Sequence, residues 1–121
     1  MKKLVAVVAF IVAVASLASA ADVSGTWVGD VPRRDGGADK TTFELKIDGD
    51  MVGGTVTTPV ATYQIKGGRV DGNDLEFYIG VNMGREVRFT YTGKVNGEEI
   101  VFSREIQGMA IRTSFVAKRP K

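Results

Sequence analysis

Hydrophobic and polar residues alternate along most of the chain after residue 20, with a period of two rather than the 3.6 of a helix. Turn sequences interrupt this alternation at regular spacing and leave segments of the length of short strands. Eight such segments span residues 23–30, 40–47, 51–57, 60–70, 74–81, 85–95, 98–105 and 109–118. The pattern therefore predicts an all-β protein built from eight antiparallel strands.

The connections between these segments are of two kinds. Asp48-Gly49, Asp71-Gly72 and Asn96-Gly97 are suited to tight hairpin turns, because Gly after Asp or Asn tolerates positive φ. The intervening connections are looser and lie at residues 31–39, 58–59, 82–84 and 106–108. In an up-and-down arrangement alternate connections meet at the same end, so the tight turns are expected at one end and the looser loops at the other. Gly67-Gly68 predicts a bulge in the fourth segment.

The aromatic residues test the predicted alternation. All five Phe residues beyond residue 20 share the face of the aliphatic side chains, and the opposite face carries mostly charged residues, Thr and Ser. The five are Phe43, Phe77, Phe89, Phe102 and Phe115. One apolar and one polar face on each strand is typical of an antiparallel meander. Eight strands close into an up-and-down barrel, which removes exposed edges, and a two-sheet β-sandwich is the alternative.

Residues 1–20 have the composition of a signal peptide. Lys2 and Lys3 precede the apolar run Leu4–Ala15, and Ala18-Ser19-Ala20 supplies the small residues of a cleavage site. The run is shorter than the roughly 20 apolar residues of a membrane span, which is the alternative interpretation. We expect cleavage after Ala20, export to the periplasm or beyond, a single β-barrel domain over residues 21–121, and no membrane span after cleavage.

Charge and composition exclude several classes of function and of partner. The chain has 16 Lys and Arg against 14 Asp and Glu, and the excess of two equals Lys2 and Lys3. The remaining chain is formally neutral, so no nucleic-acid partner is expected. The chain has no Cys and no His, which excludes disulfides, thiol nucleophiles and the commonest general base. The acidic turn residues lack the spacing of a calcium loop, and no metal or cofactor is expected.

The start of the predicted mature chain resembles a known superfamily. Ser24-Gly25-Thr26-Trp27 is similar to the Gly-x-Trp opening of the calycins, which include lipocalins, fatty-acid-binding proteins and avidins. Gly53–Val56 is similar to an avidin-type strand. In calycins the Trp packs across the closed end of the barrel under a basic residue from the last strand. The resemblance implies that Gly25, Trp27 and Arg119 form a closed end here. Trp27 is the only Trp, so the Trp-rich biotin pocket of avidins is missing.

The end with the looser loops is the expected mouth, because binding groups usually lie on loops carried by a rigid scaffold. Arg104 follows the inward alternation of its strand near this end, and a buried Arg requires a partner. Either that partner is an anionic ligand, or the strand twists there and Arg104 reaches solvent or pairs with Glu86. The candidate ligand-binding residues are Arg104, Arg85, Tyr63, Tyr91, Phe102, Met83 and Met109. The inward aromatic residues either line a pocket or fill the barrel, and loop 31–39 is either a lid or a connector.

The inward positions offer Thr, Tyr and Arg but no Asp, Glu, His or Cys, so no catalytic residues are assigned. We therefore expect an exported β-barrel that binds a small apolar or amphipathic ligand, anions included. A non-catalytic accessory or interaction module with a filled core is the alternative. A barrel isomerase or cyclase that acts by shape and by Tyr or Arg polarisation is the third hypothesis.

Overall fold

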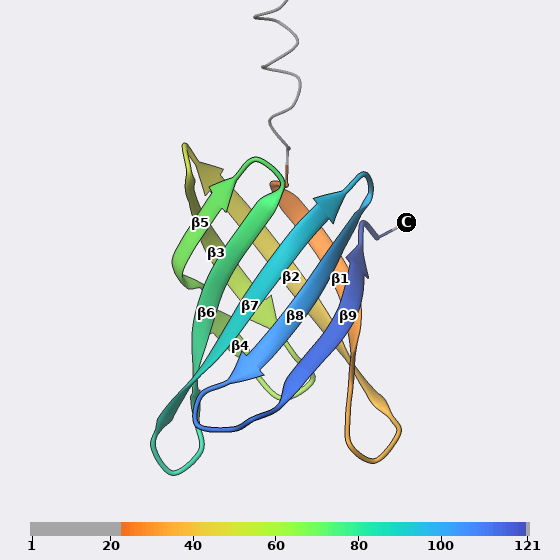
Figure 1. Ribbon diagram of the computed structural model, residues 1–121, viewed down its shortest axis with the longest axis vertical. Helices are drawn as coiled ribbons and strands as arrows, with labels where there is room; N and C mark the ends of the chain where they lie inside the picture. Colours follow the sequence, from red (N-terminus) through yellow and green to blue (C-terminus); the bar gives the residue numbers. More distant parts are fainter. Residues whose placement is uncertain (1–22, 121) are drawn as a thin grey trace, which may run out of the picture.

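The computed structural model describes residues 23–120, which form nine β-strands (Figure 1). The predicted signal peptide, residues 1–20, lies outside the described residues. The strands are β1 (Gly25–Pro32), β2 (Ala38–Asp48), β3 (Met51–Thr57), β4 (Thr62–Gln64), β5 (Lys66–Asp71), β6 (Asp74–Asn82), β7 (Glu86–Asn96), β8 (Glu99–Ile106) and β9 (Arg112–Lys118). No helix in this part of the chain is long and apolar enough to cross a membrane.

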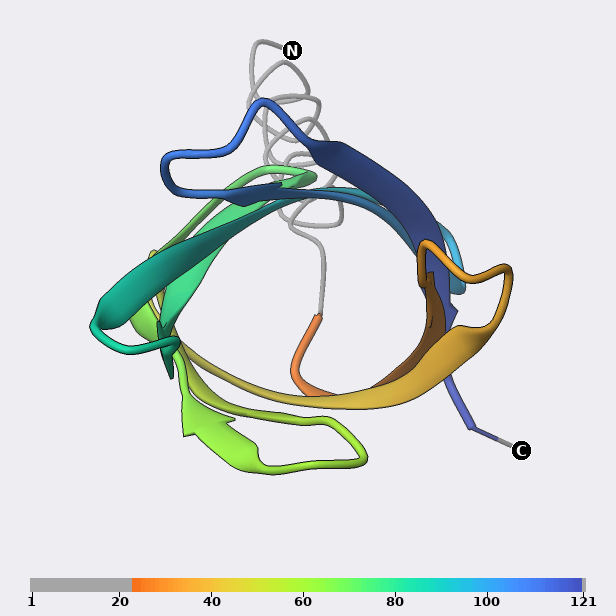
Figure 2. The same ribbon diagram turned by 90° about the horizontal axis from the view of Figure 1, so that it is seen from below.

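The strands form a single sheet that closes on itself. Each strand of the ring pairs antiparallel with its neighbours in the order β1-β2-β3-β5-β6-β7-β8-β9, and β9 pairs back with β1. Figure 2 shows this ring along the barrel axis. The predicted eight-stranded antiparallel barrel is thus confirmed. The sandwich alternative is wrong, because one continuous ring of pairings connects all eight strands.

The fourth predicted segment, 60–70, is divided into two strands. β4 pairs with the last residues of β3, whereas β5 pairs with the beginning of β3 and with β6. The register of the β5–β6 pairing shifts between Lys66 and Arg69, which flank Gly67-Gly68. The irregularity predicted at the two glycines is therefore present, and β4 becomes an extra strand beside the barrel.

The two ends of the barrel differ as the turn sequences predict. The hairpin turns β2–β3, β5–β6 and β7–β8 lie together at the top of Figure 1, and their glycines have φ values of 66°, 63° and 65°. We call this the turn end. The four longer loops, β1–β2, β3–β4, β6–β7 and β8–β9, lie at the opposite end, which we call the mouth end.

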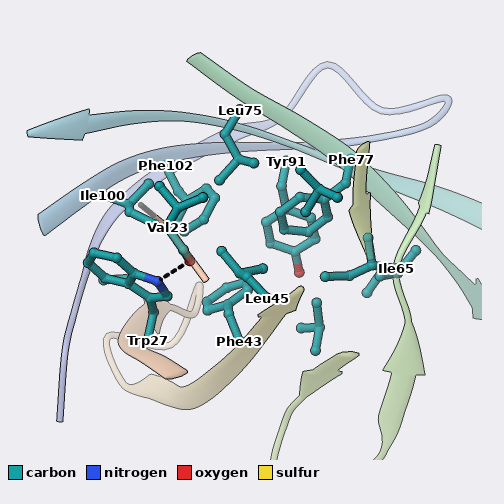
Figure 3. Packing of buried hydrophobic residues seen from close by; sticks show 14 of the residues in the cluster. Val23, Trp27, Phe43, Leu45, Ile65, Leu75, Phe77, Tyr91, Ile100 and Phe102 are labelled. Carbon is teal, nitrogen blue, oxygen red and sulfur yellow. Dashed lines mark hydrogen bonds between the residues drawn. The ribbon is translucent and has the colours of Figure 1, made fainter. Parts of the chain in front are cut away.

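Aromatic side chains fill the middle of the barrel (Figure 3). Phe43 stacks on Phe102 with ring centroids 4.9 Å apart, and Phe102 stacks on Phe115 at 5.3 Å. Phe77 and Tyr91 form a second stacked pair at 5.2 Å. These five aromatic side chains are all buried, and ring pairs of this kind stabilise the fold by more than the burial of their surface alone. At this level of the barrel the interior is a packed core.

Trp27 lies in the core on the turn-end side of these rings. Its Nε1 donates a hydrogen bond to the carbonyl oxygen of Val23 at 2.9 Å (Figure 3). The Arg119 guanidinium carbon lies 4.1 Å from the Trp27 ring centroid, and Arg119 Nη1 donates to the Ser24 carbonyl oxygen at 2.7 Å. A Cβ at Gly25 would lie 2.9 Å from Arg119 Nη1, so Gly25 leaves room for the guanidinium. Arg119 thus lies against both Gly25 and Trp27, and the closed end that the calycin resemblance implies stays a prediction.

Candidate functional site

A cavity of about 320 Å³ opens at the mouth end. Most of its wall is apolar, and that part comes from Val31, Pro32, Met83, Ile106, Met109 and Ile111. The polar part consists of Arg33, Arg34, Asp39, Arg104 and Thr113. An apolar cavity with a few convergent polar groups is the usual form of a small-molecule site, and this volume lies at the small end of the range.

Arg104 is the polar group that reaches into this cavity from the barrel wall. It lies opposite Tyr91 on β7 and Thr113 on β9, so its side chain shares the inward face with the buried Tyr91. The guanidinium carbon lies 5.3 Å from the ring centroid of Phe89, within the range of a cation–π contact.

The guanidinium of Arg104 is incompletely satisfied. Its Nε is buried and is the one such side-chain nitrogen or oxygen without a hydrogen-bond partner among residues 23–120. No carboxylate in this range forms an ion pair with Arg104. The alternative partner Glu86 instead packs beside Gly80. Because a buried, unpaired donor is costly, Arg104 retains an unmet demand for a hydrogen-bond acceptor.

Tyr91 lies beside this cation. Burial raises the pKa of the Tyr91 phenol above its ordinary value of 10.0. The Arg104 guanidinium opposes the rise through its charge and through a side-chain hydrogen bond to the phenol, both of which favour the phenolate, and Tyr63 adds a smaller upward contribution to the pKa. Tyr63 is part of β4, is half-buried and packs against the core. At neutral pH a neutral phenol therefore lies next to the positive charge of Arg104.

The raised pKa of Tyr91 predicts a loss of stability at high pH. Below pH 10 the phenol is protonated in both the folded and the unfolded state, so the full contribution of Tyr91 to the free energy of unfolding is present. Above pH 10 the unfolded chain releases this proton first, so the free energy of unfolding falls until the folded-state pKa is passed. Urea unfolding from pH 8 to 11 should show this fall, and Tyr91→Phe should reduce its slope. An identical slope in Tyr91→Phe would contradict the assignment.

Loop 31–39 forms one side of the mouth and is held by Arg33. Arg33 Nη1 donates to Asp39 Oδ1 at 2.6 Å, and Arg33 Nε donates to Asp35 Oδ1 at 3.2 Å. The Gly37 N–H also donates to Asp35 Oδ1 at 2.8 Å, and this bond and Arg33 hold the pKa of Asp35 below its ordinary value. These groups are exposed, so each pair is weak, but together they fold the loop onto itself.

The structure brings some of the predicted residues together and separates others. Met83 and Met109 line the cavity with Arg104, and Tyr91 lies directly behind it. Phe102 lies deeper, in the aromatic core. Arg85 lines a separate outer hollow of about 390 Å³ with Gly80, Asn82, Gly84 and Glu86.

Several cavity residues were missed from the sequence. Val31, Ile106 and Ile111 form much of the apolar wall. Ile106 follows Arg104 by two positions and therefore shares its face, which was the available signal. Val31 shares the buried face of Trp27 and Gly29 on β1, and Ile111 precedes Thr113 and Phe115 at the same two-residue spacing, so alternation was the available signal for these residues too.

A larger depression of about 630 Å³ lies towards the turn end. It is open and carries Asp50, Arg69, Asp71, Asp74 and Glu76 from the turns and outer strand positions. Among residues 23–120, no group of three or more Asp, Glu, His or Cys side chains is arranged to hold a metal ion. The mouth cavity is therefore the better candidate site, because it combines a mainly apolar wall with the half-buried cation of Arg104.

Comparison with known proteins bears on the architecture. No family model matches the chain, and no curated protein matches its sequence. A solved structure described as "REP1-NXSQ fatty acid transporter" is similar, with a TM-score of 0.54 and 16% sequence identity. The match covers 84% of this chain and 98% of that chain. The likeness is one of fold.

Proposed function

We propose that this protein is an exported, calycin-like β-barrel that binds a small amphipathic anion in the mouth cavity. The observation that carries the proposal is Arg104, whose buried Nε lacks a partner and whose charge no carboxylate of the described chain neutralises. A ligand carboxylate would satisfy the guanidinium with a charge-assisted hydrogen bond. The Tyr91 phenol would lie beside the same head group.

The cavity wall and the barrel core limit the ligand. Met83, Met109 and the two isoleucines offer an apolar surface to a hydrocarbon body. The stacked rings of the core close the barrel below Arg104, so a long chain cannot run the length of the barrel. A short or bent apolar body with one anionic head therefore fits best. The solved structure of similar fold, which is described as a fatty acid transporter, supports a ligand of this class.

Export and calycin membership belong to the same proposal. Export is supported by Lys2, Lys3, the apolar run and Ala18-Ser19-Ala20, and calycin membership by the Gly25–Trp27–Arg119 contact. The intact mass of the protein from a periplasmic fraction should correspond to a chain that begins at Ala21. A full-length mass in the cytoplasmic fraction would overturn the export part.

The ligand is tested with decanoate and its uncharged analogue decanol by isothermal titration calorimetry. We expect the protein to prefer decanoate by roughly tenfold or more, because a hydrogen bond to a charged group contributes about 1.5–3 kcal/mol. Arg104→Met keeps the apolar volume and removes the charge, so it should abolish this preference. Arg85→Met is the matched control, since Arg85 faces a different hollow and its loss should leave the preference unchanged.

Two results would overturn the proposal. The first is equal affinity of the wild-type protein for decanoate and decanol, which would remove the role of the charge. The second is a preference for decanoate that persists in Arg104→Met, which would show that the anionic head group binds at another site. The filled aromatic core favours a second candidate, an accessory module that acts through its surface. Absence of binding of both probes would favour that module.

A further inference from the structure

The mouth end presents apolar side chains to solvent at the tips of three loops. Val60 in the β3–β4 loop is 85% exposed, Met83 in the β6–β7 loop is 51% exposed, and Met109 in the β8–β9 loop is 46% exposed. Figure 2 shows these loops around the opening of the barrel. Large exposed apolar side chains gathered at one end indicate contact with a partner or a membrane.

The charges of the barrel are distributed unequally between its ends. The three turns at the turn end carry Asp48, Asp50, Asp71, Asp74 and Glu98 and no Lys or Arg, although Asp74 pairs with Lys94 of β7. At the mouth end, Arg34 and Arg85 form no ion pair within residues 23–120. Near a negatively charged surface the acidic turns are repelled and the two free cations are attracted, so the mouth end faces that surface.

We propose that the mouth end docks onto an anionic lipid surface, with Met83, Met109 and Val60 inserted among the acyl chains and Arg34 and Arg85 near the head groups. A lipid surface fits better than a folded protein because the apolar side chains project from separate loops. Protein interfaces require a continuous complementary surface. A fluid bilayer adapts to separate tips, and flexible Met side chains adapt in turn.

Docking in this orientation places the cavity opening against the membrane. Met83 and Met109 both line the cavity and project from its rim, so they connect the cavity with the surface on which the protein docks. An amphipathic molecule could then pass between bilayer and cavity without crossing water. The docking itself does not depend on the cavity ligand, so the two proposals can fail separately.

Vesicle sedimentation tests the docking with the chain from Ala21, which contains every strand of the closed barrel. The wild-type protein should sediment with vesicles of phosphatidylcholine and phosphatidylglycerol, and this binding should weaken from 50 to 500 mM salt. Binding to phosphatidylcholine alone should be much weaker. The double variant Met83→Glu/Met109→Glu should lower the apparent affinity for the anionic vesicles about tenfold or more, because it replaces two apolar contacts with two like charges.

Met51→Glu is the matched control. Met51 is 63% exposed but belongs to the turn end, so the same exchange there should leave vesicle binding unchanged. The altered side chains are exposed, and equal melting temperatures of the variants would exclude a folding effect. The proposal is overturned if the wild-type protein ignores anionic vesicles, if it binds neutral vesicles equally well, or if Met51→Glu weakens binding as much as the double variant does. Failure to bind any vesicle would instead favour a protein partner at the mouth.

Discussion

Trp27→Ala should destabilise the barrel by about 3–5 kcal/mol, the usual loss for a buried Trp replaced by Ala. Trp27 is 1% exposed, so the change leaves a large cavity beneath the Arg119 guanidinium. The Val23 carbonyl oxygen also loses the donor that satisfies it. Urea denaturation followed by circular dichroism measures the effect, with equal m-values required for the comparison.

Trp27→Phe separates the two parts of this loss. Phe keeps an aromatic surface under Arg119 but lacks the N–H, so its free energy of unfolding should lie between those of the wild type and Trp27→Ala. A near-neutral result for Trp27→Ala would show that the turn end is closed by other contacts. It would also remove the main structural support for the proposal that the chain is calycin-like.

Gly54→Ala should destabilise the protein by about 3 kcal/mol or more, from backbone strain and steric overlap together. Gly54 has φ of 120°, which L-residues rarely adopt. A Cβ at this position would lie 1.8 Å from the carbonyl oxygen of Glu44 on the neighbouring strand β2. Since that oxygen is part of the backbone, relief requires β2 and β3 to move apart. Thermal and urea unfolding both report the loss.

The adjacent Gly53 provides a control of the same chemistry. A Cβ on Gly53 would have no heavy atom within 4 Å, and its φ lies outside the left-handed region. Gly53→Ala should therefore change the free energy of unfolding by less than about 1 kcal/mol. Equal effects of Gly53→Ala and Gly54→Ala would contradict the close approach of β2 and β3 at Gly54.

The architecture was readable from the sequence because alternation and turn chemistry are local signals. The five Phe residues share a face in the sequence, and the Asp-Gly and Asn-Gly turns fix the hairpin ends. Arg104 could be assigned to the interior in the same way, since every second residue of a strand faces the same side of the sheet. This alternation predicts the face of the sheet on which a side chain lies, but not how deep in the barrel it lies. For this reason Phe102 was predicted among the candidate ligand-binding residues, whereas it stacks on Phe43 in the core.

The alternation of side chains between the two faces does not continue through loops. Arg85 immediately precedes β7, and its predicted place at the mouth was correct only for the end of the barrel, since it lines the outer hollow. The ion pairs that fold loop 31–39 depend on a backbone path through Gly36, whose φ is 93°, and no periodic pattern encodes that path. The missed cavity residues Val31, Ile106 and Ile111 keep the alternation of their strands, so their face was predictable from the sequence but their place in the wall of a cavity was not.

The bond between Arg119 and Ser24 has a consequence for the order of folding. It joins residues 95 positions apart, and the nearby pairing of β1 with β9 closes the ring. No fragment that stops short of β9 can complete the barrel, however many hairpins it has formed. Contacts of such sequence separation slow folding, because loop-closure entropy is lost before the contact is gained. The barrel therefore stays open until β9 has been synthesised, and a chain that is still open can be threaded through a translocation channel.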